Sequence, residues 1–293
     1  MSIPTFPKFS KIDLSMKSEL AAFDQPVNDG LSDFLFYNIY FFRDYYEYRI
    51  SQCDFGIVIR GNFEGEKFFM IPCGKIPCDF LKTALDSFGI LSFISPGLIS
   101  DNKELFSAPE FEVLEDRNNF DYLYLRSELA ELPGKKFHKK KNHVNKFKKK
   151  YTDISIKALN AETAADATAV LDKWRSVNQD DGDYRAAKEC LELIDETALI
   201  GIVLYVGTVP VAWTAAEIYD QGSMAVVYFE KADIDFEGSY QYINYAFANY
   251  LPKTVRYINR EQDLGKPGLI RAKQTYNPVA FVKKYSLSKK AEL

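Results

Sequence analysis

The chain is divided near its middle by a strongly basic segment, residues 135–150, which contains nine lysines and no acidic residue. Pro133 and Gly134 stand immediately before it, and this pair is typical of a break between regular elements. The full length of 293 residues suits two domains of ordinary size. The sequence therefore predicts an N-terminal domain over 1–133, a basic connecting helix over 134–151 and a C-terminal domain over 152–293.

The basic segment has the pattern of a helix that docks by one face. At about 100° per residue, its apolar side chains fall on one narrow stripe. These side chains are Phe137, Val144, Phe147 and Tyr151. Lys140 falls inside the same stripe, where an ammonium must extend to the surface or meet an anion. We expect the segment to contact anions or nucleic acid through Lys139, Lys140, Lys141, His143 and Lys146.

The net charge of −4 argues against a general nucleic-acid-binding protein, but it hides an uneven distribution. Without the nine lysines of residues 135–150 the rest of the chain would carry −13, so the cationic signal is local. Three interpretations of the basic segment are open: a solvated helix face, a surface for a polyanion such as RNA, and a surface for anionic lipid headgroups.

The sequence predicts no metal site. The two histidines, His138 and His143, point in directions roughly 140° apart on a helix and cannot share one metal ion. The four cysteines are interpreted as reduced thiols; a zinc site is the alternative, but the close pair Cys73 and Cys78 has no second pair. No apolar run reaches the ~18 residues that cross a bilayer, and the N-terminus lacks a signal-peptide pattern, so we expect a cytoplasmic protein.

The C-terminal half alternates strands with helices, which indicates an α/β (α+β) fold. Its expected strands are 153–158, 199–206, 209–219, 223–230, 254–259 and 279–287, and its expected helices are 160–177, a second one from 183, 239–250 and 267–276. The N-terminal half repeats this order more weakly. A helix at 32–42 and one at 77–88 accompany expected strands at 45–52, 55–60, 67–71, 90–94, 110–115 and 121–125. The repeated order suggests that the two halves share one architecture.

Two runs of the chain resemble a known family. The first extends from Tyr124 to Phe147 and reads YLRSELAELPGKKFHKKKNHVNKF; the second extends from Tyr257 to Pro278 and reads YINREQDLGKPGLIRAKQTYNP. Together they are similar to the phosphatidylglycerol lysyltransferase C-terminal domain family. The resemblance implies two tandem GNAT-like domains, each a mixed, mostly antiparallel sheet flanked by helices, as in the Fem-type aminoacyltransferases. It also implies aminoacyl-tRNA as the donor, an amine or a lipid hydroxyl as the acceptor, and no cofactor.

The second run supplies most of the expected site. Asp263, Gly265 and Gly268 form a turn into a helix that carries Arg271, Lys273 and Tyr276. The resemblance implies that Tyr276 protonates the leaving group, with Asp263 as a further catalytic residue and Arg271, Lys273, Gly265, Gly268 and Gly238 as substrate-binding residues. Glu230 ends a strand where such folds open around the acceptor, and a carboxylate there suits a general base, with Glu217 as a weaker alternative.

The region before Gly238 bears on the donor. In acyl-CoA-dependent relatives of this fold, backbone N–H groups of a glycine-rich loop hold the pyrophosphate at a helix N-terminus. Here Asp233, Asp235 and Glu237 surround the single glycine, and carboxylates repel a pyrophosphate. We therefore expect an aminoacyl- or acyltransferase that uses aminoacyl-tRNA and a small-molecule, peptide or lipid acceptor. The alternatives are a non-catalytic binding protein on the same scaffold and an acyl-CoA-dependent N-acyltransferase.

Overall fold

The computed structural model describes residues 2–21, 30–178 and 182–290. The chain forms two compact units, and neither is continuous in sequence. Unit 1 consists of Met1–Asp121, Gln262–Gly265 and Val282–Leu293, and unit 2 of Tyr122–Glu261 and Lys266–Phe281. The expected division at residues 134–151 thus differs from the division by contacts, because the end of the chain returns to the first unit.

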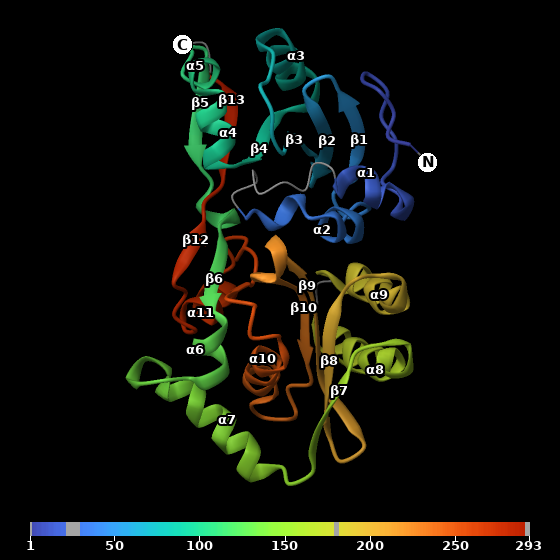
Figure 1. Ribbon diagram of the computed structural model, residues 1–293, viewed down its shortest axis with the longest axis vertical. Coiled ribbons are helices and arrows are strands. Elements are labelled where there is room, and N and C mark those ends of the chain that lie inside the picture. The colour runs from blue at the N-terminus through green and yellow to red at the C-terminus, as the bar shows by residue number, and fades with distance from the viewer. Residues whose placement is uncertain (1, 22–29, 179–181, 291–293) are drawn as a thin grey trace. The chain divides into compact units, whose positions relative to one another are not determined.

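The sheet of unit 1 is mixed. Its strands, in spatial order, are β1 (Arg49–Cys53), β2 (Gly56–Phe63), β3 (Glu66–Met70), β4 (Ile90–Ile94), β13 (Tyr285–Lys289) and β5 (Phe111–Glu115) (Figure 1). Strands β3 and β4 pair in parallel, and the antiparallel pairs lie on either side of them. A parallel pair requires a crossover, and helix α3 (Cys78–Phe88) provides it.

The core of unit 1 lies between this sheet and its helices. Val58, Phe69 and Leu91 of the sheet pack with Leu81 and Leu85 of α3. Four short α-helices complete the unit: α1 (Lys17–Ala21), α2 (Phe36–Phe41), α4 (Pro96–Asp101) and α5 (Lys103–Phe106). Single 3₁₀ turns occur at Leu14–Met16, Ser32–Phe34 and Arg117–Asn119. The helix expected at 32–42 is therefore shorter than the sequence pattern indicates.

The sheet of unit 2 is also mixed and has seven strands, one more than the sheet of unit 1. Its strands, in spatial order, are β12 (Ala280–Val282), β6 (Asp121–Leu125), β11 (Tyr257–Asn259), β10 (Met224–Ala232), β9 (Val209–Tyr219), β8 (Ile200–Val206) and β7 (Ile154–Ala158). Strands β10 and β11 pair in parallel, and helix α10 (Ser239–Tyr250) connects them. The two predicted mixed sheets flanked by helices are confirmed.

Helices cover both faces of the second sheet (Figure 1). On one side, Ile243 and Phe247 of α10 and Phe147 of α7 (His138–Lys150) pack against inward side chains of β8 to β10. Helices α8 (Ala161–Val177) and α9 (Tyr184–Glu192) lie on the other side. Smaller helices are α6 (Arg126–Glu131) and α11 (Pro267–Gln274), with 3₁₀ turns at Lys135–Phe137, Ile194–Glu196 and Asp220–Gly222.

Local signals set the helix starts only in part. Asn160 caps α8, because its side chain accepts hydrogen bonds from the N–H groups of Glu162 and Thr163. Asp183 precedes α9 but makes no side-chain cap. Its carboxylate instead accepts a hydrogen bond from the buried Lys231 at 2.7 Å, an ion pair that the local pattern does not reveal.

The end of the chain differs from the prediction. The expected single strand 279–287 is wrong: it is broken into β12, which joins the sheet of unit 2, and β13, which joins the sheet of unit 1. In unit 1, β13 lies between β4 and β5, and in unit 2, β6 of the N-terminal half pairs with β11. Each sheet is thus completed by a strand from the other half of the sequence.

A buried charge cluster marks the break between β12 and β13. Lys284 is fully buried and forms ion pairs with Asp33 and with Asp121, the latter at 2.7 Å. Ser32 donates both its backbone N–H and its hydroxyl to Asp121. Burial raises the pKa of the Asp33 carboxyl to about 6, although Lys284 opposes this. The three charges stabilise unit 1 only while all of them are present.

Replacement of Lys284 by Met should therefore destabilise the protein. The change leaves two buried carboxylates facing each other, and loss of one partner from a buried ion pair costs about 3–5 kcal/mol. The free energy of unfolding from denaturant titration at pH 7 measures this. Lys283→Met is the matched control, because Lys283 is half-exposed and pairs with a half-exposed Glu115, so its loss should change stability by roughly 0.5 kcal/mol or less. Equal effects of the two changes would contradict the interpretation.

Candidate functional site

The site in unit 2 begins where two parallel strands separate. The pairing of β10 with β11 ends at Val226 and Asn259, but β10 continues to Ala232. The register of β10 against β9 also shifts between Val227 and Phe229, which marks a β-bulge. Ligands of open α/β sheets bind beyond the carboxyl ends of such strands. The side chains that follow the separation, Glu230 on β10 and Arg260 after β11, lie at this position.

Arg260 is the centre of a buried polar cluster. Its Nη2 donates to Oε1 of Glu230 at 2.9 Å, and the two side chains are 14% and 10% exposed. The guanidinium carbon lies 5.0 Å from the ring centroid of Tyr276 and 6.0 Å from that of Tyr124. Four further side chains meet Glu230 and Arg260 here, and we refer to the six as the Arg260 cluster: Glu230, Arg260, Tyr276, Tyr124, Lys140 and Asn244.

The Tyr276 hydroxyl is buried and in contact with Arg260. Burial raises the pKa of its hydroxyl well above the usual value, and the positive charge and hydrogen bond of Arg260 only partly oppose this. The Tyr124 ring lies edge-on to the Tyr276 ring, with 6.4 Å between their centroids. A tyrosine hydroxyl is protonated at neutral pH in any case, and the contact with Arg260 is what favours release of its proton.

Asn244 contributes an unsatisfied acceptor. Its Nδ2 donates to Oε2 of Glu230 at 3.4 Å, while its buried Oδ1 has no hydrogen-bond partner among the described residues. A buried acceptor without a donor costs roughly 1–3 kcal/mol, so native proteins rarely retain one without a reason. The orphaned oxygen beside a carboxylate suits a ligand that carries N–H or O–H donors.

Lys140 reaches the same cluster from α7. Its Nζ lies 3.8 Å from the ring centroid of Tyr276. Burial, and next the positive charge of Arg260, lower the pKa of this amine to about 8, while Glu230 opposes the change. The predicted apolar stripe of the helix is confirmed, since Phe137, Val144 and Phe147 are buried. Lys140 lies within that stripe, as its sequence position indicates.

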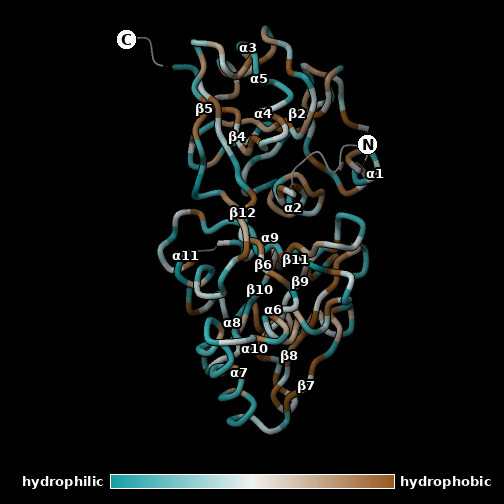
Figure 2. The backbone as a smooth tube through the Cα atoms, turned by 60° about the vertical axis from the view of Figure 1, so that its left-hand side comes forward, coloured by the Kyte–Doolittle hydropathy of each residue, from teal (hydrophilic) through white to brown (hydrophobic). Residues whose placement is uncertain are grey.

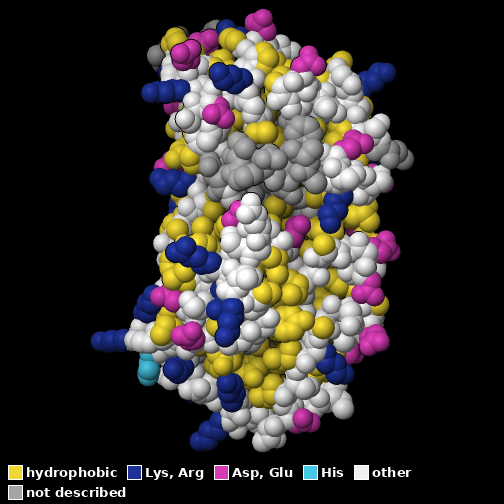
Figure 3. Space-filling model, in the orientation of Figure 1, with side chains coloured by type: hydrophobic (Ala, Val, Ile, Leu, Met, Phe, Trp, Pro, Cys, Tyr) yellow, Lys and Arg dark blue, Asp and Glu magenta, His cyan; other side chains and the backbone are white. Residues whose placement is uncertain are grey.

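The opposite face of α7 is exposed and cationic. Lys139, Lys141, His143 and Lys146 all lie on the surface. The backbone of α7 is hydrophilic along most of its length in Figure 2, and in Figure 3 Lys and Arg side chains line the lower left edge, over α7. The five residues expected to bind anions therefore divide into four exposed ones and Lys140, which faces the interior.

Residues 262–265 of the second family-like run form a turn in unit 1. Asp263 is 1% exposed, accepts a hydrogen bond from the N–H of Gly265 at 2.9 Å and pairs with Arg117 at 3.3 Å. Gly265 has a φ of 66°, and a side chain there would meet Asn118 at 3.0 Å. These contacts account for Asp263 and Gly265 as turn-forming residues of unit 1, so the structure does not bring them into the Arg260 cluster of unit 2.

The later part of the second family-like run, from Lys266 onward, belongs to unit 2. Lys273 donates from Nζ to the carbonyl oxygens of Arg260 and Glu261, at 2.6 and 3.0 Å, and so fixes the backbone that presents the Arg260 side chain. Arg271 is exposed and lines a surface hollow of about 430 Å³ along α11. Gly268 lies in the first turn of α11, and a Cβ added there would meet no atom within 4 Å. Of the expected catalytic residues, the structure brings Glu230 and Tyr276 together.

The segment before α10 is held by internal ion pairs and hydrogen bonds. Asp233 and Asp235 both pair with Lys173, at 2.9 and 2.6 Å. The N–H of Asp235 is already donated to the Asp233 carboxylate. Gly238, with a φ of 91°, lies against α7, where an added Cβ would stand 3.4 Å from the carbonyl oxygen of His143. That distance is an ordinary contact, so the glycine is required by its left-handed backbone and not by the space beside α7.

Three members of the cluster were not expected from the sequence: Arg260, Tyr124 and Asn244. Arg260 had a usable signal, because it directly follows the strand 257–259 within the second family-like run. Tyr124 begins the first family-like run, but an aromatic residue in a strand fits many roles. Asn244 had no signal, since an amide in a helix fits many roles as well. Glu217, the weaker candidate base, instead accepts a hydrogen bond from the Tyr228 hydroxyl at 2.6 Å.

Two further properties bear on the kind of site. In the described part of the chain, no group of three or more His, Cys, Asp or Glu side chains is arranged to hold a metal ion. Across the same residues, none of the helices combines the length and the apolar character needed to cross a membrane.

Each sheet contains an antiparallel three-stranded run, a crossover helix and a parallel fourth strand, which are β1 to β4 with α3 in unit 1 and β8 to β11 with α10 in unit 2. This is a tandem GNAT-like fold, found in a family of transferases. The chain belongs to the phosphatidylglycerol lysyltransferase C-terminal family, whose sequence profile matches residues 25–288. The resemblance seen in the two sequence runs is thereby confirmed.

Similar proteins support the fold. A conserved protein of unknown function from Bacteroides thetaiotaomicron has 29% identity and a TM-score of 0.85, with 96% of this chain and 99% of that one covered. L-PGS from Bacillus licheniformis has 14% identity, a TM-score of 0.61 and coverages of 94% and 92%. FemX has 8% identity, a TM-score of 0.55 and 97% of each chain covered.

Among curated relatives, an uncharacterised protein of Mycoplasmoides gallisepticum is 24% identical over 185 residues. The match includes 60% of this chain and spans 58% of the length of that relative.

Lys140→Met should stabilise the protein at neutral pH. The difference between the usual pKa of 10.5 and about 8 corresponds to about 3 kcal/mol against the charged form, and partial exposure of the amine reduces the expected gain to about 1–2 kcal/mol. Between pH 8 and 10.5 the folded state has released the proton that the unfolded state still binds. Stability of the wild type therefore rises with pH, and the advantage of the variant shrinks.

Denaturant titrations at several values between pH 6 and pH 10 measure this, with exposed Lys139→Met as the control. A stabilisation that is independent of pH, or equal in both variants, would contradict a desolvated amine at position 140.

Proposed function

We propose that this protein is an aminoacyl- or acyltransferase whose chemistry takes place at the Arg260 cluster of unit 2. The observation that carries the proposal is the convergence of Glu230, Arg260 and Tyr276 where β10 and β11 separate. A buried proton donor, a buried cation and a carboxylate with an adjacent orphaned acceptor are the groups that transfer of an ester-bound acyl group to an amine or hydroxyl requires.

Each group has a role in such a transfer. The acceptor amine or hydroxyl binds by donating to Glu230 and to the orphaned Oδ1 of Asn244. Glu230, or Lys140 in its neutral form, takes the proton of the acceptor as it attacks the ester carbonyl. Arg260 stabilises the oxyanion that develops on the carbonyl oxygen. Tyr276 protonates the oxygen of the departing alcohol, so that the aminoacyl group moves and the alcohol leaves neutral.

Two observations support aminoacyl-tRNA as the donor. The segment before Gly238 carries carboxylates that disfavour the pyrophosphate of acyl-CoA, and the N–H group of Asp235 is already engaged within the segment. The exposed face of α7 offers a row of lysines that suits a phosphate backbone. The relatedness to L-PGS and FemX is consistent with this assignment. The acceptor is a small molecule, a peptide or a lipid that carries an amine or a hydroxyl.

The chemistry can be tested without the natural acceptor. Purified protein is mixed with tRNA charged with radiolabelled amino acids, with ethanolamine or glycerol as a surrogate acceptor, and loss of the ester is followed under single-turnover conditions. Tyr276→Phe should slow transfer by about 10²-fold because the proton donor is lost, while tRNA binding is retained. Tyr250→Phe, on the exposed end of α10, should have no effect. Charged tRNA that binds but is never deacylated would instead favour the non-catalytic alternative.

Binding of tRNA is tested separately by titration at several salt concentrations. Three or four phosphate contacts to single-stranded RNA should give a slope of roughly −2 to −3 in log K against log salt. The variant with Lys139, Lys141 and Lys146 all changed to Glu should lose binding and keep its melting temperature, since all three are exposed.

The matched control changes the same number of exposed lysines elsewhere in unit 2, namely Lys157, Lys188 and Lys253, and should retain most of the binding. Acetyl-CoA serves as a comparison ligand and should not bind in the low micromolar range. Wild-type protein that ignores tRNA at low salt would exclude this donor and leave the lysines as a solvated helix face.

A further inference from the structure

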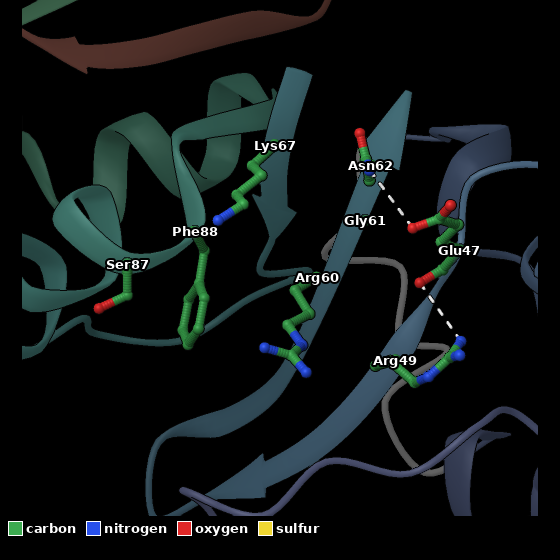
Figure 4. A pocket seen from close by; sticks show the side chains of 8 residues that line it. All are labelled: Glu47, Arg49, Arg60, Gly61, Asn62, Lys67, Ser87 and Phe88. Carbon is green, nitrogen blue, oxygen red and sulfur yellow. Dashed lines mark hydrogen bonds between the residues drawn. The ribbon is translucent and has the colours of Figure 1, made fainter. Parts of the chain in front are cut away.

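Unit 1 contains a cationic hollow that the proposed function does not use. It has a volume of about 250 Å³ and lies on the α3 side of the sheet, at the ends of β1, β2 and β3 (Figure 4). Its charged lining residues are Glu47, Arg49, Arg60 and Lys67, which leaves a formal charge of +2. Figure 4 shows Arg60 and Lys67 extending from their strands toward the side where Phe88 lies.

The strand register places two arginines in an unfavourable position. Arg49 of β1 is paired directly with Arg60 of β2, and Asn62, two residues further along β2, is paired with Lys67 of β3. Because like charges opposite each other on neighbouring strands destabilise a sheet, three cations on one face require compensation. Glu47 provides part of it, although its carboxylate accepts a hydrogen bond from Asn62 at 3.3 Å.

Among the described residues, the three cations have no ion-pair partner. Arg49 donates to the backbone carbonyl oxygens of Glu47 and Tyr48. Over the described residues, neither Arg60 nor Lys67 has a carboxylate partner. Instead, the Arg60 guanidinium carbon lies 4.6 Å from the ring centroid of Phe9 and 5.7 Å from that of Phe88. The aromatic rings hold the guanidinium in place and leave its N–H donors available.

An apolar groove continues from this hollow. It has a volume of about 690 Å³ and shares Arg60, Ser87 and Phe88 with the hollow. The rest of its wall is mainly aromatic and apolar: Phe6, Pro7, Phe9, Phe80 and Ala84. Asp79 also lies on this wall, and it disfavours a second anion there. The combined site is therefore cationic at one end and apolar along the remainder.

We propose that this site binds an organic phosphate monoester, with the phosphate in the hollow and a flat apolar or aromatic substituent in the groove. A phosphate dianion matches the charge of +2, and its oxygens accept paired hydrogen bonds from a guanidinium. Lys67 adds a point charge, and the aromatic wall packs against the substituent. The site lies wholly in unit 1 and does not depend on the function assigned to the Arg260 cluster.

The probe for this site is phenyl phosphate, titrated into the full chain by calorimetry, with inorganic phosphate and phenol as the two halves of the ligand. Phenyl phosphate should bind saturably and at least about tenfold more tightly than either half. Arg60→Met and Lys67→Met should each weaken it about tenfold, whereas Lys75→Met, an exposed lysine outside the site, should change the Kd by less than about twofold.

Thermal melts of the same proteins separate binding from folding. Without ligand, Arg60→Met should melt at the wild-type temperature or above it, because the change removes a like-charge pair. Lys67 is exposed, so Lys67→Met gives an independent variant if Arg60→Met does not fold. Equal binding of phenol and phenyl phosphate, equal losses in Lys67→Met and Lys75→Met, or binding only to vesicles of anionic phospholipid would each overturn the proposal.

Discussion

The architecture of unit 1 depends on the buried ion cluster at Lys284. This lysine follows β12 and precedes β13, at the point where the chain leaves one sheet and enters another. Its partners Asp33 and Asp121 come from the N-terminal half, so the charges tie the returning C-terminal strand to the residues beside which it must lie. Without β13, strand β5 would have no neighbour in the sheet and β4 would become an edge strand. A buried ion triad contributes little net stability, but it specifies one arrangement, because a shifted register would leave charges unpaired.

Local elements follow from the sequence, whereas the exchange of strands does not. Helix α3, strand β4 and the capped start of α8 could be predicted because periodicity and capping act within a few residues. Strand β6 was also predicted at 121–125, but nothing in its residues shows that it pairs with β11. Sheet membership depends on contacts more than a hundred residues apart, which no local pattern encodes. For the same reason the final strand was expected to be continuous.

The candidate site shows the same limit. Glu230 and Tyr276 were expected because strand ends and a family-like run indicate them, and the structure places both against Arg260. Asp263 and Gly265 belong to the same run but form a turn in unit 1. Lys273 acts through its bonds to backbone oxygens, as a positioning residue for Arg260. The motif therefore does not distinguish residues that form the turn in unit 1 from those that face the separated strands of unit 2.

The two faces of helix α7 lie in different electrostatic environments: one faces solvent and the other faces the buried Arg260 cluster. On the exposed face the lysines lie in solvent, and a row of such side chains attracts a polyanion at long range. On the buried face, Lys140 stands beside the ring of Tyr276 and close to the charge of Arg260, where burial disfavours the ammonium. One helix thus presents solvent-exposed lysines on its outer face and, on its inner face, a lysine whose ammonium form is disfavoured by burial. In the proposed transfer, a polyanion that docks on the outer face would find the inner amine already at the Arg260 cluster, so α7 would link recognition of the donor to removal of the acceptor's proton.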